Sequence, residues 1–415
     1  MRFQAPRGTE DILPDRTPAW QWIEHEFRVL AGLYGYGEIR TPTFEDRDLF
    51  LRTSGETSDV VSKEMYDFRD KGDRHMALKP ESTAPAMRAL IEHNLCPQGT
   101  VTRLCYVSSP HFRYDRPQKG RLREHHQCGI ELVGSPSAAA DAEVIEIGYR
   151  FLERVGLTEL RVKINSIGRS ECRAAYRDAL LNHAAPYLQQ ASEEVRATAD
   201  KNPLRLLDMK DPVAQEAMKG APSILDYLED DSKDRFDEMQ RLLNAAGIPF
   251  MVSPDIVRGL DYYTETVFEC QSDSLGAQST VFAGGRYDNL IKEIGGPSLP
   301  SVGFGMGVER LLLLLEAGDL VPGPSRAKVF VAYSEAVRGE ASALVRDLRA
   351  AGIATLTDID ARSLKSQLRQ ADKSGATFVA ILGEDEIAAA SVSLKELETG
   401  EQRSVARDEI VRVLR

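Results

Sequence analysis

The stretch HFRYDRPQKGRLREHHQCGIE, residues 111–131, is the most informative part of this chain of 415 residues. Five basic side chains fall within eleven of its residues, and Pro117 and Gly120 predict a turn among them. If its second half is a strand, Gln127 and Glu131 point to the same face, because side chains alternate along a strand. Such a hairpin suits a ligand with phosphates at one end and an amine or imidazole at the other. The alternative is a solvated basic hairpin.

The flanking segments show helical and strand periodicities. Trp20, Ile23, Phe27 and Leu30 recur at helical spacing, and the glycine-rich run 303–307 is expected to open a long apolar helix. We expect helices at 17–33, 82–93, 138–155 and 306–317, and strands at 38–45, 100–114, 122–133, 160–164, 250–252, 262–270 and 278–283.

Length and composition indicate a globular protein of two or three domains. No run of eighteen apolar residues occurs, so no membrane span is expected. The five cysteines are scattered and form no Cys-x-x-Cys pair. That pattern favours reduced thiols in a cytoplasm over a disulfide framework or a zinc site, and we predict no protein-held metal.

The charge is unevenly distributed. The whole chain carries a formal net charge of −12, whereas residues 326–415 contain fourteen lysines or arginines and fourteen aspartates or glutamates. The acidic excess therefore lies in residues 1–325, and the C-terminal part is a compositionally different unit. This balance argues against a nonspecific nucleic-acid coat, but it leaves room for an RNA partner bound through local patches.

Two further segments suggest the domain organisation. Residues 168–247 are helical in pattern, polar and interrupted by prolines, which indicates a module inserted between strand-rich segments. After a linker rich in glycine and proline, strand and helix patterns alternate from residue 329 to 383 and predict a small α/β domain with a mainly parallel sheet. We therefore expect domains at 1–325, with the insertion at about 168–247, and at 326–415.

Six sequence blocks carry a family resemblance. They are PRGTEDILP (6–14), GYGEIRTPTFE (35–45), LKPEST (78–83), FRYDRPQKGR (112–121), VRGLDYYTETVFE (257–269) with FAGGRYDNL (282–290), and GFGMGVER (303–310). In this order they resemble the histidyl-tRNA synthetases, a family of class II aminoacyl-tRNA synthetases. The resemblance implies an α/β fold: a class II catalytic domain with a mixed, mainly antiparallel sheet flanked by helices, a helical insertion and a C-terminal α/β anticodon-binding domain.

The resemblance also implies an activity. L-Histidine would be activated with ATP and Mg²⁺ to histidyl-adenylate, releasing pyrophosphate, and then transferred to the 3′ end of tRNA(His). A homodimer in the cytoplasm is implied as well. The alternative is a noncatalytic, synthetase-like regulatory subunit of histidine biosynthesis. Such paralogues usually lack the C-terminal domain and degrade the RGLDYY signature, both of which this chain retains.

Arginines are the implied catalytic and ATP-binding residues. The resemblance places Arg113 on the α-phosphate, Arg310 on the γ-phosphate and the adenine face, and Arg258 across the substrate carboxylate and the α-phosphate. A planar guanidinium binds oxyanions through two parallel hydrogen bonds and stays charged, which suits this reaction. Arg121 would reach the outer phosphates or the tRNA end, and Asp115 the adenine. For Arg310, a helix cap or an ion pair is the alternative.

The histidine pocket is implied by further matched positions. A carboxylate can accept a hydrogen bond from the imidazole N–H, and a tyrosine hydroxyl can donate or accept one. Without Arg258 nearby, Tyr262 and Tyr263 would be interpreted as ordinary strand aromatics. The implied residues are Glu131 and Tyr263 for the imidazole, Glu81, Thr83 and Gln127 for the α-amino group, and Tyr262, Tyr287 and Gly305 for the pocket wall.

Four positions depart from the family pattern, one of them His125, which stands where the family more often has an aromatic residue and is expected to change only the packing. Lys79 and Ser82 stand where the family more often has arginine and then glycine or methionine. Asp115 replaces a usual glutamate, and the loss of one methylene shortens its reach towards adenine.

Overall fold

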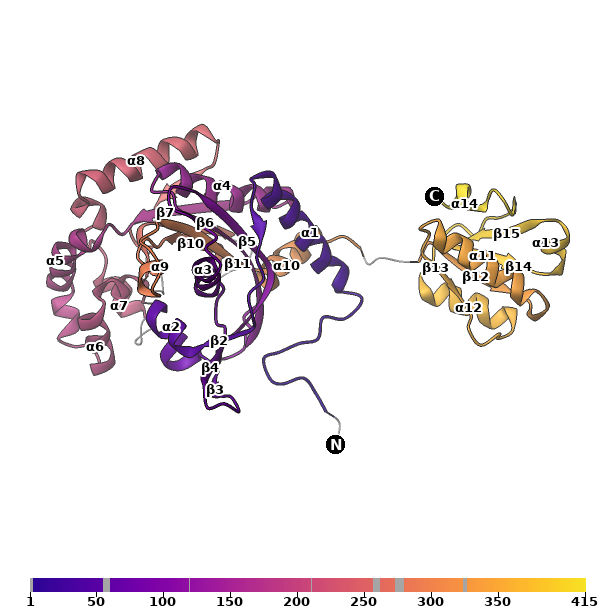
Figure 1. The fold of residues 1–415 in the computed structure, drawn as a ribbon, viewed down its shortest axis with the longest axis horizontal. Coiled ribbons are helices and arrows are strands. Elements are labelled where there is room, and N and C mark those ends of the chain that lie inside the picture. The colour runs from indigo at the N-terminus through magenta and orange to yellow at the C-terminus, as the bar shows by residue number, and fades with distance from the viewer. Residues whose placement is uncertain are drawn as a thin grey trace. The chain divides into compact units, whose positions relative to one another are not determined.

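The computed structural model describes residues 3–54, 60–118, 120–209, 211–256, 262–272, 280–323 and 327–415. The chain forms two compact units, Met1–Pro322 and Gly323–Arg415, and each is described by itself (Figure 1).

Among the described residues, the first unit is built on a sheet of eight strands in the order β1-β5-β6-β11-β10-β9-β7-β8. The strands from β5 to β7 in this order run antiparallel to their neighbours, whereas the outer pairs β1–β5 and β7–β8 are parallel. The bounds are β1 Gly37–Glu38, β5 Thr102–Phe112, β6 Glu124–Val133, β11 Ser301–Gly307, β10 Thr280–Arg286, β9 Thr264–Ser272, β7 Leu160–Ser166 and β8 Phe250–Val252. A smaller sheet has the order β2-β4-β3, with β2 Phe44–Asp46, β4 His75–Leu78 and β3 Asp67–Arg69.

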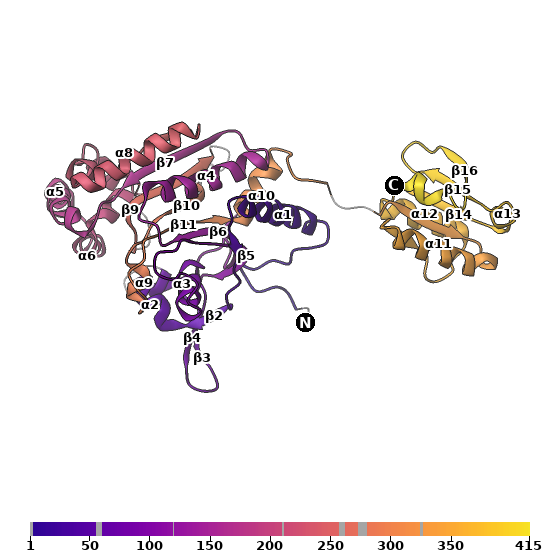
Figure 2. The same cartoon turned by 45° about the horizontal axis from the view of Figure 1, so that its top comes forward.

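Helices cover both faces of the large sheet (Figure 2). One face packs against α1 (Thr17–Leu33), α4 (Ala138–Arg154), α8 (Asp230–Ala245) and α10 (Val308–Ala317). The other face carries α3 (Thr83–Glu92) and α9 (Leu290–Glu293), with α2 (Arg47–Ser54) beside them and the short π-helix η1 (Val60–Glu64).

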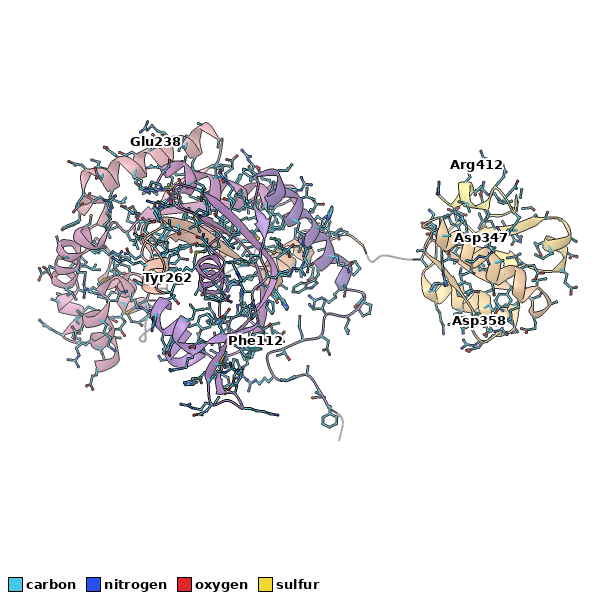
Figure 3. All side chains as sticks on the ribbon, viewed as in Figure 1. Phe112, Glu238, Tyr262, Asp347, Asp358 and Arg412 are labelled. Carbon is cyan, nitrogen blue, oxygen red and sulfur yellow. The ribbon has the colours of Figure 1, made fainter. Side chains whose placement is uncertain are left out.

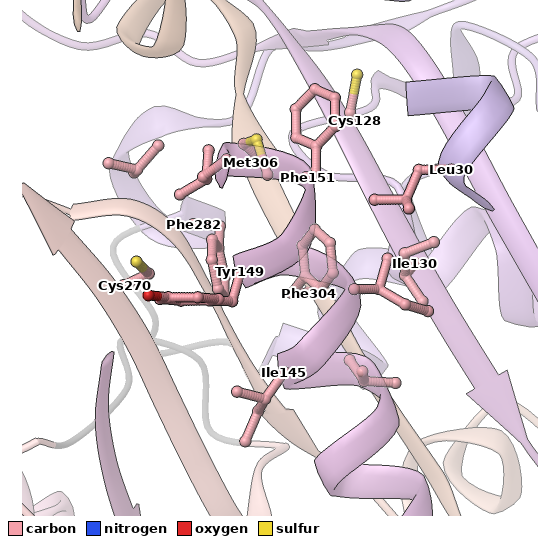
Figure 4. Packing of buried hydrophobic residues seen from close by; sticks show 14 of the residues in the cluster. Leu30, Cys128, Ile130, Ile145, Tyr149, Phe151, Cys270, Phe282, Phe304 and Met306 are labelled. Atoms are coloured by element: carbon pink, nitrogen blue, oxygen red, sulfur yellow. The ribbon is translucent and has the colours of Figure 1, made fainter. Parts of the chain in front are cut away.

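The main core lies between the sheet and α4 (Figure 4). Ile145, Tyr149 and Phe151 of α4 belong to one buried cluster with Phe282 of β10 and Phe304 of β11. A methyl group on Gly148 would lie 2.7 Å from the Phe282 ring, so glycine permits this close approach of helix and strand.

The predicted insertion consists of helices between β7 and β8. They are α5 (Ser170–Leu188), α6 (Glu193–Lys201), η2 (Pro203–Asp208), α7 (Pro212–Ala217), η3 (Ile224–Tyr227) and α8. Its last helix, α8, is part of the main core, because Phe236, Met239 and Leu243 pack in the same cluster as α4. The segment from α5 to α7 lies outside that core, and Leu225 of η3 packs against its edge.

The second unit contains a sheet in the order β13-β12-β14-β15-β16. Strand β12 pairs in parallel with β13 and β14, while β14–β15 and β15–β16 are antiparallel. The bounds are β12 Val329–Tyr333, η5 Glu335–Val337, α11 Arg338–Ala350, β13 Thr355–Thr357, α12 Leu364–Ser374, β14 Phe378–Leu382, α13 Glu384–Ala388, β15 Ser391–Glu396, β16 Gln402–Ala406 and α14 Ile410–Leu414. The sheet is thus mixed, and the prediction of a mainly parallel sheet was wrong. The sequence analysis missed the antiparallel hairpin β15–β16.

Two other local predictions were wrong. The strand expected at 38–45 is divided into β1 and β2, because Pro42 has no N–H to donate to a strand ladder. The run 303–307 does not open a helix but ends strand β11, and α10 begins at Val308. The fold class predicted from the sequence is confirmed: a mixed, mainly antiparallel sheet flanked by helices, a helical insertion and a C-terminal α/β unit.

Candidate active site

A cavity of about 620 Å³ opens over strands β6 and β11 in the first unit. Figure 3 shows the side chains of this unit and labels Tyr262, which lines the cavity, and Phe112, which precedes the lining residue Arg113. Most of the predicted site residues meet in this cavity: Glu81, Thr83, Arg113, Asp115, Arg121, Gln127, Tyr262, Tyr263, Gly305 and Arg310. Glu131 and Tyr287 lie behind its wall, and Arg258 lies outside the described residues.

The cationic end begins at Arg113, directly after β5. Its Nε donates to the Pro80 carbonyl at 3.0 Å, and its Nη1 lies 3.9 Å from Oε2 of Glu64. Burial lowers the pKa of Arg113, while the Glu64 and Glu81 carboxylates raise it. The Arg113 guanidinium therefore lines the cavity with one hydrogen bond to the Pro80 carbonyl and with the Glu64 carboxylate nearby.

Arg121 and Asp115 face each other across the basic turn. Nη2 of Arg121 lies 2.5 Å from Oδ2 of Asp115 and 3.5 Å from Oε1 of Glu64. Gly120 has φ +72° in this turn, and a methyl group there would lie 2.8 Å from Leu313. Asp115 is thus the ion-pair partner of Arg121, and its contact with adenine stays a prediction.

Arg310 enters the cavity from the first turn of α10. Its Nη1 donates to the Thr280 carbonyl at 3.1 Å, which connects α10 to β10. Burial is the main cause that lowers its pKa, and the nearby positive charge of Arg121 lowers it further. Arg113, Arg121 and Arg310 thus converge on one end of the cavity, as an oligophosphate requires.

The other end of the cavity is built around the fully buried carboxylate of Glu131. The Thr83 hydroxyl donates to its Oε1 at 2.7 Å, and the Tyr287 hydroxyl donates to its Oε2. Burial raises the pKa of Glu131 to about 8, although these two hydrogen bonds act to lower it. The network therefore holds a buried carboxyl group directly behind Thr83, which lines the cavity.

Glycines of β11 make room for this network. Gly303 pairs with Glu131 and Gly307 with Gln127 in the antiparallel register, and Gly305 lies between them. A methyl group on Gly303 would lie 2.0 Å from Oε2 of Glu131, and one on Gly305 would lie 3.2 Å from Oε1 of Gln127. Gly305 and Gly307 therefore line the cavity, while Gly303 makes room for Glu131 behind it.

Glu81 caps a helix at the edge of the same pocket. Its carboxylate accepts the N–H of Thr83 at 2.5 Å and the N–H of Ala84 at 2.9 Å, at the start of α3. Burial raises the pKa of Glu81, and these backbone hydrogen bonds lower it. The carboxylate is thereby fixed beside Thr83, where a substrate ammonium group would gain a buried anion.

Tyr262 and Tyr263 immediately precede β9. Their ring centroids lie 4.7 Å apart, and the Tyr262 ring meets the Tyr287 ring edge-on at 5.7 Å. A methyl group on Gly285 would lie 2.8 Å from the Tyr263 ring, so glycine leaves the space that this ring fills. These tyrosines line the cavity beside the Glu131 network.

Two of the departures from the family pattern, Lys79 and Ser82, lie on either side of Pro80, whose carbonyl accepts the hydrogen bond of Arg113. The Lys79 side chain is buried, and Nζ donates to the carbonyl and hydroxyl of Thr41 at 3.4 and 3.3 Å. The Ser82 hydroxyl lies 2.7 Å from Nε2 of the buried His111. Both side chains therefore have polar partners within the unit and do not enter the cavity.

Several lining residues were missed by sequence reasoning. Tyr106 could have been found from strand pairing, because it lies opposite Gly129, on the face that Gln127 and Glu131 share. Glu64, and the insertion residues Arg173, Thr198, Asn202, Leu204, Arg205 and Met209, gave no local signal, since the tertiary fold brings them to the cavity.

The described residues add two observations on membranes and metals. None of their helices has the length and apolar character that crossing a bilayer requires. They also contain no cluster of three or more histidine, cysteine, aspartate or glutamate side chains arranged to hold a metal ion.

Comparisons with known proteins identify the family. A family model described as histidyl-tRNA synthetase matches residues 8–311, and an anticodon-binding domain model matches residues 327–415. The chain belongs to the histidyl-tRNA synthetase family.

Full-length relatives agree with this assignment. A protein of Synechococcus elongatus named histidine–tRNA ligase is 46% identical over 99% of this chain and 94% of its own length. A protein of Caldanaerobacter subterraneus with the same name is 45% identical over the whole of both chains. The crystal structure of the apo histidyl-tRNA synthetase of S. aureus is 34% identical, has a TM-score of 0.84 and covers both chains completely. The family resemblance inferred from the six sequence blocks is confirmed.

Proposed function

We infer that this chain is a histidine–tRNA ligase, an enzyme that activates histidine with ATP and transfers it to tRNA. The observation that carries the inference is a single cavity with converging arginines at one end and a buried carboxylate–hydroxyl network at the other. The family and the full-length relatives support the same reading, and they do not favour the noncatalytic regulatory subunit.

The cationic end is suited to the chemistry at phosphorus. The histidine carboxylate attacks the α-phosphate of ATP and pyrophosphate leaves, so negative charge must be stabilised while two anions are brought together. In our proposal Arg113 binds the α-phosphate, Arg310 the γ-phosphate and the adenine face, and Arg121 the outer phosphates. Arg121 must exchange Asp115 for a phosphate oxygen to do so, which leaves the Asp115 carboxylate available to the adenine amine.

Arg258 is the remaining proposed catalytic residue. By family resemblance it spans the histidine carboxylate and the α-phosphate, so that one guanidinium would bind both reacting groups. Its assignment rests on the RGLDYY signature, of which Tyr262 and Tyr263 line the cavity.

The network end would select histidine. We propose that Tyr263 and Glu131 bind the imidazole, and that Glu81, Thr83 and Gln127 bind the α-amino group. Tyr262, Tyr287 and Gly305 would complete the wall. Each oxygen of Glu131 accepts one hydroxyl, from Thr83 or from Tyr287, and a carboxylate oxygen can accept a second hydrogen bond, which the imidazole N–H would supply. A ligand without a ring N–H would leave buried polar groups unpaired and would bind poorly.

Magnesium fits as a companion of ATP. Mg²⁺ prefers oxygen ligands and is commonly held by phosphates together with one or two carboxylates. Glu64 and Glu309 supply carboxylate oxygens to the cavity wall and would complete such a site. Bound there, the ion would neutralise charge on the outgoing pyrophosphate.

We also propose the partner, assembly and location implied by the family. The unit that matches the anticodon-binding model would read tRNA(His), and residues 1–325 and 326–415 would be the two domains. The homodimer is proposed from the family resemblance. A cytoplasmic location is consistent with five free, buried cysteines.

Charging of tRNA(His) with labelled histidine tests the proposed function. The purified chain, with ATP and Mg²⁺, should form histidyl-tRNA(His) and should leave a tRNA of another specificity uncharged. Arg258→Ala should abolish charging with little change in the urea midpoint. A folded wild-type chain that charges no tRNA(His) would instead support the regulatory-subunit alternative.

A further inference from the structure

Two arginines at the start of α5, the first helix of the insertion, donate hydrogen bonds to residues at the start of β9. Nη2 of Arg173 donates to the Tyr263 carbonyl at 3.0 Å, and Nε of Arg169 donates to Oε1 of Glu265 at 2.8 Å. Arg169 is the N-cap residue of α5, and Arg173 lies in its first turn. Together they hold the residues on both sides of Thr264.

Glu265 shows how firmly this junction is held. Its side chain is 2% exposed, and its backbone has φ 51°, a left-handed conformation that is unfavourable for a residue other than glycine. The Ser232 hydroxyl of α8 also donates to its Oε1, at 2.9 Å, and its backbone exchanges hydrogen bonds with Ile167 and Gly168. Such a conformation persists only where the surroundings determine it from several sides.

Apolar contacts connect the insertion to the same tyrosines. Tyr176 of α5 is 1% exposed and belongs to one buried cluster with Tyr262, Tyr263 and Tyr287. Arg173 and Tyr263 both line the cavity. The insertion is therefore hydrogen-bonded to the main chain of Tyr263 and shares a buried cluster with its side chain.

We propose that Arg173 is a positioning residue for histidine binding, through which the insertion sets the geometry of the histidine pocket. This inference rests on the proposed function of the cavity. Tyr263 can present its hydroxyl to an imidazole only if its main chain is held, and the Arg173 guanidinium holds the carbonyl of that residue. A displacement of α5 would move the Tyr263 main chain with it.

The test is steady-state ATP–pyrophosphate exchange with histidine and ATP varied separately. Arg173→Ala should raise the KM for histidine about tenfold, the order of effect expected from one hydrogen bond to a charged group. The KM for ATP should change less than twofold. Arg173→Lys should restore much of the histidine KM, because an ammonium group can donate to the same carbonyl.

A matched control lies one turn further along α5. Arg177 donates to the Asp200 carbonyl at 3.4 Å, within the insertion, so Arg177→Ala should leave both KM values within twofold of wild type. If Arg173→Ala does not fold, Arg173→Gln is measured in its place, with a rise in the histidine KM again expected.

Two outcomes overturn the proposal. One is a histidine KM within twofold of wild type in the folded variant. The other is an equal rise of both KM values together with a lower urea midpoint, which would indicate a purely structural role. A wild-type chain without any histidine-dependent exchange would refute the proposed function instead.

Discussion

The protonation of Glu131 should be visible in the stability of the first unit. Its carboxyl group is fully buried, and burial raises its pKa from an ordinary 4.5 to about 8. A raised pKa means that the folded state binds the proton more tightly than the unfolded state. The stability contributed by this proton is therefore complete below about pH 4.5 and is lost as the pH rises towards 8.

The magnitude follows from the shift in pKa. One pKa unit corresponds to about 1.4 kcal/mol, so the wild-type free energy of unfolding should fall by roughly 3 kcal/mol between about pH 5 and pH 8 through Glu131 alone. Glu131→Gln keeps the shape of the side chain but does not titrate. Other titrating groups are common to both proteins, so the difference between them isolates Glu131.

The assay is urea unfolding followed by tryptophan fluorescence at the two pH values. The chain has two tryptophans, Trp20 and Trp22, both in α1, so the signal reports on the first unit and not on the second. Glu124→Gln, a partly exposed change on the same strand, should follow wild type. A pH-dependent difference between wild type and Glu131→Gln of less than about 1 kcal/mol would refute the buried, proton-binding carboxylate.

Three further substitutions test other parts of the account. Arg286→Ala leaves the fully buried Asp141 without its two hydrogen bonds from the Arg286 guanidinium, of 3.0 and 2.8 Å. The free energy of unfolding should fall by about 3 kcal/mol in the same urea assay, and a loss below about 1 kcal/mol would contradict this. Gly303→Ala places a methyl group 2.0 Å from Oε2 of Glu131 and should reduce histidine-dependent exchange at least about tenfold, whereas wild-type exchange would show that the pocket adapts. Tyr263→Phe should raise the KM for histidine and leave the KM for ATP unchanged. An unaltered histidine KM would show that the Tyr263 hydroxyl does not bind the imidazole.

Elements with strong local patterns were predictable from the sequence. The helix at 17–33 was found because Trp20, Ile23, Phe27 and Leu30 follow the helical period, and all four are buried in α1. The hairpin of β5 and β6 was found from its turn residues and charges. In these segments the local pattern and the tertiary burial agree, so single-sequence reasoning succeeds.

The errors arose where a local signal was ambiguous. In the run 303–307, glycine suggested a turn, yet Val302, Phe304 and Met306 alternate with the glycines and are buried, as in a strand. The alternation was present in the sequence, but the low strand propensity of glycine obscured it. The reason for the glycines is tertiary: their missing side chains make room for Glu131 and Gln127.

Site residues divide in the same way. Gln127 and Glu131 were paired from strand alternation, whereas the roles of Glu81, Tyr263 and Arg310 came from family resemblance. Contacts made by the insertion, such as Arg173 with the Tyr263 carbonyl, join residues 90 positions apart in sequence. No periodicity or motif encodes such a contact, so it required the structure.

ATP–pyrophosphate exchange measured with each of the standard amino acids in turn tests the central claim most directly. A cavity with phosphate-binding arginines at one end and the Glu131 network at the other should support exchange with histidine and Mg²⁺, and with no other amino acid at comparable rates. Absence of exchange with histidine, or equal exchange with an amino acid that lacks a ring N–H, would contradict the account.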